Sequence, residues 1–180
     1  MSKKQKIYFL TYGDSRKYKT STKHLISLAK ESGFFEKQIS MSKKDLDTDF
    51  KKKYSDILSQ NRGGGYWLWK HKIIENLLNE VNDNDIVFYT DAGSSFNYFG
   101  QKKFYEYIDI LNSSNFDNLR FEIGESFIEK YWTSKEIFNY FNIDLNNNLA
   151  NTPQLVGGHL FFVKNKDTFD FLNEFKNTIT

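Results

Sequence analysis

The chain lacks cysteine altogether and has a single proline, Pro153, among its 180 residues. Without cysteine, a disulfide framework and thiolate zinc sites are both excluded. One proline excludes a proline-rich hinge, and neither an internal repeat nor a low-complexity linker interrupts the sequence. A chain of this length can bury a sizeable core, so one domain covering residues 1–180 is expected.

Long hydrophobic runs are also missing. The basic start, from Met1 to Lys6, resembles the first part of a signal peptide, but the apolar run that follows covers only residues 7–10. A signal peptide needs an apolar run of roughly 7–15 residues, and a membrane span needs about 20. The sequence therefore predicts a cytoplasmic protein without a transmembrane segment.

The chain has little net charge, because its 25 basic residues nearly balance its 23 acidic ones. Such a chain is not a polycation built for phosphate backbones, and nucleic acid is not the expected partner. Single-strand binding through the tyrosine and tryptophan residues stays open as an alternative. Aromatic residues are plentiful at 18%, which provides enough apolar mass for a packed core.

Short apolar runs alternate with amphipathic segments along the chain. The runs predicted as strands cover residues 7–10, 86–89 and 160–163, with an alternating candidate at residues 120–123. The helical apolar stripes lie at residues 25–29, 73–81, 104–111, 137–141 and 169–175. Strands that alternate with helices predict an α/β layer fold, a mainly parallel sheet flanked by helices. Residues 40–54 are interpreted as a solvated excursion and residues 144–151 as a loop.

Ligands of open parallel sheets bind beyond the carboxyl ends of the strands. The first predicted strand exit, residues 11–15, has hydroxyls and one glycine that could approach a base or ribose, or it is a generic turn. The second exit, residues 90–95, carries Asp91 on a buried strand. A carboxylate there either holds Mg²⁺ or Mn²⁺ against a diphosphate or caps the next turn.

Residues 62–70 read Arg-Gly-Gly-Gly-Tyr-Trp-Leu-Trp-Lys. Three consecutive glycines indicate that a bare backbone is needed, and the neighbouring rings and cations could stack on a base or sugar while meeting phosphate. A flexible loop, tryptophan packed in the core and an RNA-binding tail are the alternatives. Core packing of at least one tryptophan is expected whichever applies.

Paired glycines, Gly157 and Gly158, precede the last predicted strand and permit either close ligand approach or a bulge. His159 follows them. It could bind a metal or act as a base, but a lone histidine is more often structural.

The order of these segments is more specific than any one of them. A glycine-rich turn, Tyr-Trp-x-Trp-Lys, an apolar helix and a strand ending in Asp-Ala-Gly resemble a family of bacterial and viral glycosyltransferase-like proteins with the GT-A architecture. Residues 132–135 and 153–158 continue the pattern, so the resemblance spans nearly the whole chain. It implies a GT-A-like nucleotide-binding domain.

The resemblance also implies roles for individual residues. The nucleotide end would be lined by Thr11, Tyr12 and Gly13, and the nucleotide sugar would be held by Arg62, Trp69 and Lys70. The substrate side would be formed by Ala92, Gly93, Gln154, Gly157 and Gly158. Asp91 matches the first aspartate of the Asp-x-Asp motif, which implies Mn²⁺ or Mg²⁺ as cofactor.

The implied activity is transfer of a sugar from a nucleotide-diphosphate sugar to the hydroxyl of a glycan, lipid-linked or protein acceptor. The metal and Lys70 or Arg62 would stabilise charge on the departing diphosphate. Glu122 and Glu125 are candidate acceptor bases, with surface solvation as the alternative for either one. Gly93 stands where the motif has its second aspartate, and the chain ends soon after residues 160–163, so a truncated or minimal member is expected.

Two other functions stay open. A non-catalytic carbohydrate- or nucleotide-binding module could use the same aromatic segment. A Rossmann-like methyltransferase is the second, although residues 11–15 contain one glycine rather than a glycine-rich turn.

Overall fold

The computed structural model describes residues 5–114 and 116–180 and contains a five-stranded sheet in the order β2-β1-β3-β5-β4. Its strands are β1 (Ile7–Tyr12), β2 (Lys37–Met41), β3 (Ile86–Thr90), β4 (Asn118–Leu119) and β5 (His159–Val163). β1 pairs parallel with β2 and β3, whereas β5 pairs antiparallel with β3 and β4. The α/β class is confirmed, and the sheet is mixed, because β5 runs antiparallel to both of its neighbours.

The reversed direction of β5 follows from where the strand begins. Its first residue, His159, lies opposite Thr90 at the carboxyl end of β3. The pairing continues past the strands, because the Asp91 N–H donates to the Gly158 carbonyl at 2.9 Å. If β5 ran parallel to β3, the residues before β5 would lie at the other end of the strands, far from Asp91.

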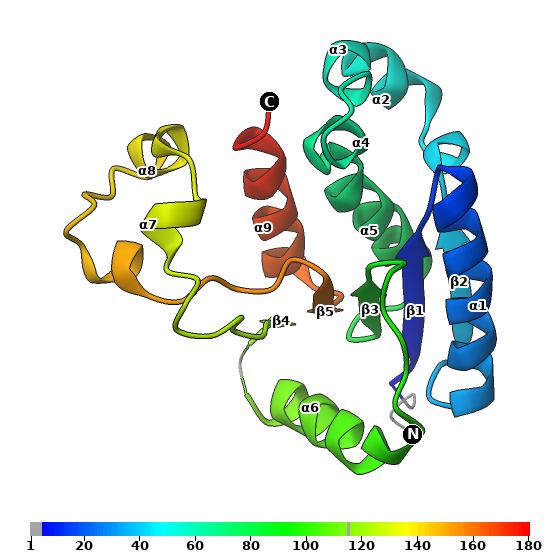
Figure 1. The fold of residues 1–180 in the computed structure, drawn as a ribbon. Coiled ribbons are helices and arrows are strands. Elements are labelled where there is room, and N and C mark those ends of the chain that lie inside the picture. The colour runs from blue at the N-terminus through cyan, green and yellow to red at the C-terminus, as the bar shows by residue number, and fades with distance from the viewer. Residues whose placement is uncertain (1–4, 115) are drawn as a thin grey trace.

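Four longer helices cover the two faces of the sheet (Figure 1). They are α1 (Arg16–Ser32), α5 (Leu68–Glu80), α6 (Gln101–Ser113) and α9 (Lys166–Asn177). One core lies between the sheet and α5 with α9, where Leu10, Val87 and Tyr89 are fully buried. A second core lies between the sheet and α1 with α6 and includes Phe9 and Phe161. Burial on both faces explains the continuous apolar runs, and the helices predicted at residues 25–29, 73–81, 104–111 and 169–175 are confirmed.

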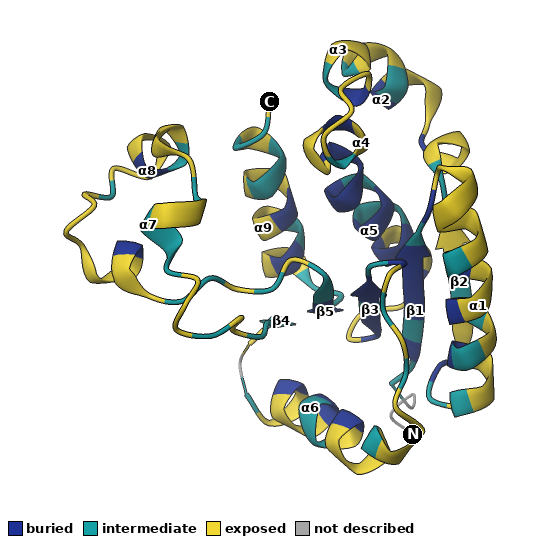
Figure 2. Cartoon of the chain, in the orientation of Figure 1, coloured by how far each residue is buried: buried dark blue, intermediate teal, exposed yellow. Residues whose placement is uncertain are grey.

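Residues 40–54 were predicted to be a solvated excursion, which is wrong in part. They contain the end of β2, η1 (Lys43–Asp45) and α2 (Thr48–Lys53), and they bury Leu46 and Phe50 at 2% and 8% exposure. The lysines of this stretch remain mostly at the surface, as Figure 2 shows for the exposed faces of these elements. The two buried apolar side chains anchor this segment to the core although most of its residues are polar. The polar composition alone therefore does not predict its structure.

The remaining elements are short. They are α3 (Ser55–Leu58), α4 (Gly63–Tyr66), η2 (Tyr98–Gly100), α7 (Glu129–Trp132), α8 (Lys135–Tyr140) and η3 (Asn148–Asn151). The strand expected at residues 120–123 is instead β4, two residues earlier, followed by an isolated bridge between Glu122 and Leu155. The segment from α7 to η3 projects from the sheet and is largely exposed (Figures 1 and 2). No helix in the described ranges is long and apolar enough to cross a membrane.

Candidate functional site

A cleft of 580 Å³, cleft A, opens where β1 and β3 end. Its walls come from residues 12–15, residues 63–64, Trp67, Trp69 and residues 91–93. The N-terminus of α1 lies at this cleft, because Ser15 lines the cleft and also caps the helix. The Ser15 hydroxyl accepts a hydrogen bond from the Tyr18 N–H. Free N–H groups and the helix dipole favour negative charge at such an end. Lys43 also lines cleft A, and so does the acidic Asp14.

The three glycines form a compact left-handed turn. Gly63, Gly64, Gly65, Tyr66 and Trp67 all have positive φ, between 51° and 98°. A side chain on Gly65 would meet the Leu58 backbone at 2.7 Å, and one on Gly63 would meet the Trp67 ring at 2.5 Å. Left-handed backbone costs a residue with a Cβ roughly 1–2 kcal/mol, so the glycines are needed here for conformation and for packing.

Trp69 fixes this turn against the sheet. Its indole N–H donates to the Gly63 carbonyl at 2.9 Å, and its ring stacks on Tyr12 with centroids 3.8 Å apart. Burial leaves Trp69 only 6% exposed, which confirms the expectation of a core tryptophan, whereas Trp67 is 42% exposed. Burial is also the main cause that raises the pKa of Tyr12, so its hydroxyl stays neutral.

Asp91 is held by two donors on one of its oxygens. The Tyr89 hydroxyl donates to Oδ1 at 2.5 Å, and the Lys70 ammonium donates to the same atom at 3.2 Å. Tyr89 and Asp91 lie two residues apart and so share one side of the chain. Within the described residues no hydrogen bond reaches Oδ2, and the Asp91 side chain is 48% exposed. Oδ2 is therefore the oxygen open to a ligand.

Lys70 connects α5 to the loop before β5. Its ammonium donates to the Gly157 carbonyl at 2.8 Å as well as to Asp91, while its side chain is only 8% exposed. Burial lowers the pKa of Lys70, the Asp91 carboxylate raises it, and the charge of Arg120 lowers it. The ammonium is thus a cation with little water around it. Gly158 completes this corner, since a Cβ there would lie 2.9 Å from Asp91 Oδ2.

A second cleft of 600 Å³, cleft B, lies between the β5 end of the sheet, α5, α9 and residues 155–158. Apolar side chains from β5 and α9 form most of its walls, and Lys70 and Arg120 supply its positive charge. Clefts A and B share two residues, Trp67 and Asp91, which therefore stand at the junction of the two spaces.

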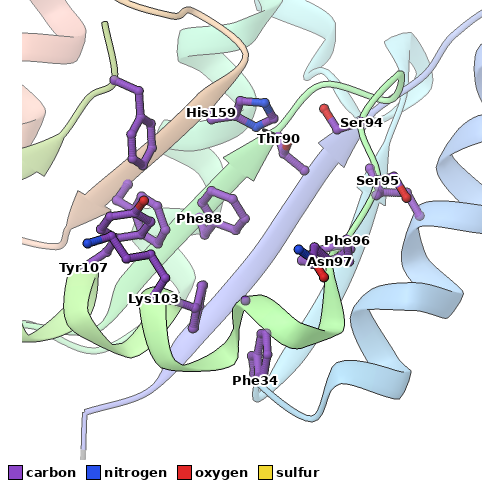
Figure 3. A pocket seen from close by; sticks show the side chains of 15 residues that line it. Phe34, Phe88, Thr90, Ser94, Ser95, Phe96, Asn97, Lys103, Tyr107 and His159 are labelled. Atoms are coloured by element: carbon purple, nitrogen blue, oxygen red, sulfur yellow. Dashed lines mark hydrogen bonds between the residues drawn. The ribbon is translucent and has the colours of Figure 1, made fainter.

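A third pocket of 350 Å³ lies between α6 and the sheet (Figure 3). His159 lies there beside Thr90, with His159 Nδ1 2.7 Å from the Thr90 hydroxyl. Burial lowers the pKa of His159. Its neighbours in the pocket are mainly aromatic, and this environment fits the structural role expected of a lone histidine.

The structure distributes the other predicted site residues unevenly. Thr11 is fully buried inside β1, with a hydroxyl oxygen that meets no partner among the described residues. Gln154 turns to α7, where its amide donates to Glu129 and Thr133. Arg62 and Glu122 are exposed. None of Thr11, Arg62, Glu122 and Gln154 is part of the walls of cleft A or B, whereas the other predicted site residues line one or both.

Two site residues were missed by the sequence reasoning. Tyr89 could have been found, because strand alternation puts it on the side of Asp91. Arg120 carried no usable signal, since its neighbours Phe162 and Phe171 are more than forty residues away along the chain.

The donor set for a metal is small. In residues 5–114 and 116–180, no group of three or more histidine, aspartate or glutamate side chains could hold an ion. Asp91 Oδ2 is one open carboxylate oxygen, which fits a magnesium or manganese ion when substrate phosphates and water supply the other ligands. Comparison of the chain with protein-family models, with curated proteins and with solved structures finds no match.

Proposed function

We propose that this protein is a glycosyltransferase that moves a sugar from a nucleotide-diphosphate sugar to an acceptor hydroxyl, in a GT-A-like domain. The observation that carries the proposal is the meeting of clefts A and B at Asp91 and Trp67. Group transfer between two substrates requires both to reach one point. Two spaces of similar volume that share a carboxylate and an indole ring provide such a point.

Cleft A suits the donor. Its aromatic side chains can stack on a base, and the α1 N-terminus and Lys43 favour phosphate. Lys70 lines cleft B beside Asp91, so its charge would act on a diphosphate that reaches the junction of the two clefts. Arg62 and Glu122 lie outside both clefts, so neither has a role in the proposed sugar transfer.

A divalent cation, Mn²⁺ or Mg²⁺, completes the proposed donor site. Asp91 Oδ2 would hold it together with the diphosphate oxygens, and Tyr89 and Lys70 would keep the carboxylate oriented through Oδ1. When bound, the cation neutralises charge on the diphosphate.

One observation favours a second candidate, a nucleotide- or carbohydrate-binding module without catalysis. Gly93 replaces a second carboxylate, and Asp91 is the single acidic side chain at the junction of the clefts. A site of this kind could hold a nucleotide sugar without transferring it.

The test is a panel of nucleotide-diphosphate sugars, each with and without Mn²⁺, measured by thermal stabilisation and by release of free sugar. A ligand at 100 times its dissociation constant stabilises the folded state by about 2.7 kcal/mol. We expect one donor to stabilise the wild type in a Mn²⁺-dependent way and to be hydrolysed slowly. Stabilisation without sugar release, or without transfer to any acceptor, would favour the binding module.

The variants are Asp91→Asn and a matched control, Asp83→Asn. Asp83 is an aspartate with an 86% exposed side chain, in the turn between α5 and β3, outside both clefts. Asp91→Asn should abolish the Mn²⁺ dependence while Asp83→Asn retains it. If Asp91→Asn and wild type behave alike in both assays, the metal role of Asp91 is wrong.

A further inference from the structure

Arg120 is a half-buried cation without an acidic partner among the described residues. Its guanidinium lies 4.6 Å from the Phe162 ring and 5.0 Å from the Phe171 ring, and its Nε donates to Asn118 Oδ1 at 3.2 Å. Across the described residues no carboxylate forms an ion pair with it, and its Nη2 atom is buried without a hydrogen-bond partner. Burial lowers the pKa of Arg120 to about 10, which leaves it charged at neutral pH.

Such a cation is costly to the folded protein. Removing a charged group from water is strongly unfavourable unless a partner compensates, and native structures leave few buried donors unpaired. Contacts with two aromatic rings compensate in part. An arginine in this position has the donors and the planar geometry to bind a carboxylate or phosphate in a bidentate manner.

Arg120 lines cleft B, whose other walls are mostly apolar. Leu160, Phe162, Leu172 and Phe175 belong to this lining. The volume of 600 Å³ is typical of a site for a small organic ligand. Lys70, the second cation of the cleft, is paired with Asp91, so the charge left without a counter-ion belongs to Arg120.

We infer that cleft B binds a small amphipathic anion, a carboxylate or phosphate group attached to an apolar chain. The anionic head pairs with Arg120, and the apolar chain lies against the side chains of β5 and α9. Charge complementarity selects the head, and the apolar walls select the chain. The contact with Arg120 requires neither sugar transfer nor a metal ion at Asp91, so it can be tested separately from the proposed function.

The experiment uses isothermal titration calorimetry with octyl phosphate, octanoate, octanol and inorganic phosphate, all below concentrations at which they form micelles. We expect saturable one-to-one binding of octyl phosphate or octanoate, and the tighter of the two identifies the head group. Octanol and inorganic phosphate should each bind at least tenfold more weakly. Equal affinity for octanol, equal affinity for inorganic phosphate, or no saturable binding of either anion would overturn the inference.

Arg120→Met tests the residue, and Lys37→Met is the matched control, because it removes a positive charge from the exposed residue Lys37 of the edge strand β2. Arg120→Met should reduce affinity for the preferred anion at least tenfold, to the level of octanol, while Lys37→Met leaves it unchanged. Wild-type affinity in Arg120→Met overturns the inference.

A second variant covers the case in which Arg120→Met does not fold. Leu155 lines cleft B and is 55% exposed, so Leu155→Asp is compatible with folding. A carboxylate in this wall should repel the anionic head and weaken binding at least tenfold. Unchanged affinity in Leu155→Asp contradicts the placement of the ligand in cleft B.

Discussion

Tyr12 and Trp69 stack face to face, with planes only 12° from parallel and centroids 3.8 Å apart. Tyr12 ends β1, and Trp69 is the second residue of α5, next to the left-handed turn, so this one contact joins the sheet to the turn. The turn carries Trp67 into both clefts. The position of the candidate site therefore depends on a packing contact at its base.

The two tryptophans should respond differently to the same substitution. Trp69→Phe removes the bond to Gly63 and part of a buried ring, and we expect it to lower the free energy of unfolding by roughly 2–3 kcal/mol. Trp67→Phe alters an exposed ring and should change stability by less than about 1 kcal/mol. Urea unfolding of both variants measures the difference. Equal losses would show that Trp69 does not anchor the turn.

The glycine turn gives a second matched pair. Gly65→Ala places a Cβ 2.7 Å from the Leu58 backbone, at φ 98°, so both strain and a clash oppose it. Gly64→Ala meets nothing closer than 3.6 Å, and its φ is 60°. We expect Gly64→Ala to cost about 1 kcal/mol and Gly65→Ala about 3 kcal/mol or more. Thermal or urea denaturation ranks them, and the reverse order would contradict the packing described.

Gly93→Asp should strengthen the proposed binding of Mn²⁺. A Cβ at Gly93 meets no atom within 4 Å, so the added carboxylate fits without displacing its neighbours. It would stand two residues from Asp91 and provide a second oxygen ligand. We expect at least tenfold tighter Mn²⁺ binding by calorimetry than in wild type.

Gly100→Asp is the control for that substitution. Gly100 is equally open, but it precedes α6 and lies outside clefts A and B. Its variant should bind Mn²⁺ as the wild type does. A similar gain in both variants would mean that added charge alone, rather than the position beside Asp91, explains the effect.

His71 predicts a pH dependence of stability. The side chain is 3% exposed between Phe50 and Phe175, and burial lowers its pKa from 6.5 to about 4. Between these two values the unfolded chain binds a proton that the folded chain does not, so stability falls as pH falls. The loss should approach about 3 kcal/mol from pH 6.5 to pH 4.

His71→Phe removes that titration and keeps a ring of similar shape. Urea unfolding at pH 7 and pH 4.5 should show a smaller loss of stability on acidification in the variant than in the wild type. The same loss in both would assign the pH dependence to other groups. His159, whose pKa burial also lowers, is one of these and is unchanged by the substitution.

The fold was predictable where local pattern and burial agree. Residues 86–89 are apolar, as suits a strand of which both faces are covered. Both this strand and the position of Asp91 just after it could therefore be predicted. β2 was not predicted, because Lys37 and Ser40 face solvent at the sheet edge and leave little apolar signal. The direction of β5 was also missed, since strand polarity depends on the path of residues 120–158 rather than on the strand's own sequence.

Several residues of the candidate site could be predicted from the sequence, but their contacts only in part. Lys70 and Asp91 were both expected there, while their ion pair could not be derived from residues 21 positions apart. Gln154 was assigned to the ligand side, but its amide turns to Glu129 and Thr133. Short-range spacing predicts which side of a strand a residue takes, and long-range packing decides what it meets there.

The shared wall of clefts A and B has a thermodynamic consequence. A ligand in cleft A that shifts Trp67 or the carboxylate of Asp91 changes the shape and charge of cleft B. Linkage then requires reciprocity, so occupancy of cleft B alters affinity in cleft A by the same factor. Through Trp67 and Asp91, a ligand in either cleft would therefore set the apparent affinity of the other cleft for its own ligand. The total binding free energy of the two ligands does not depend on which of them binds first.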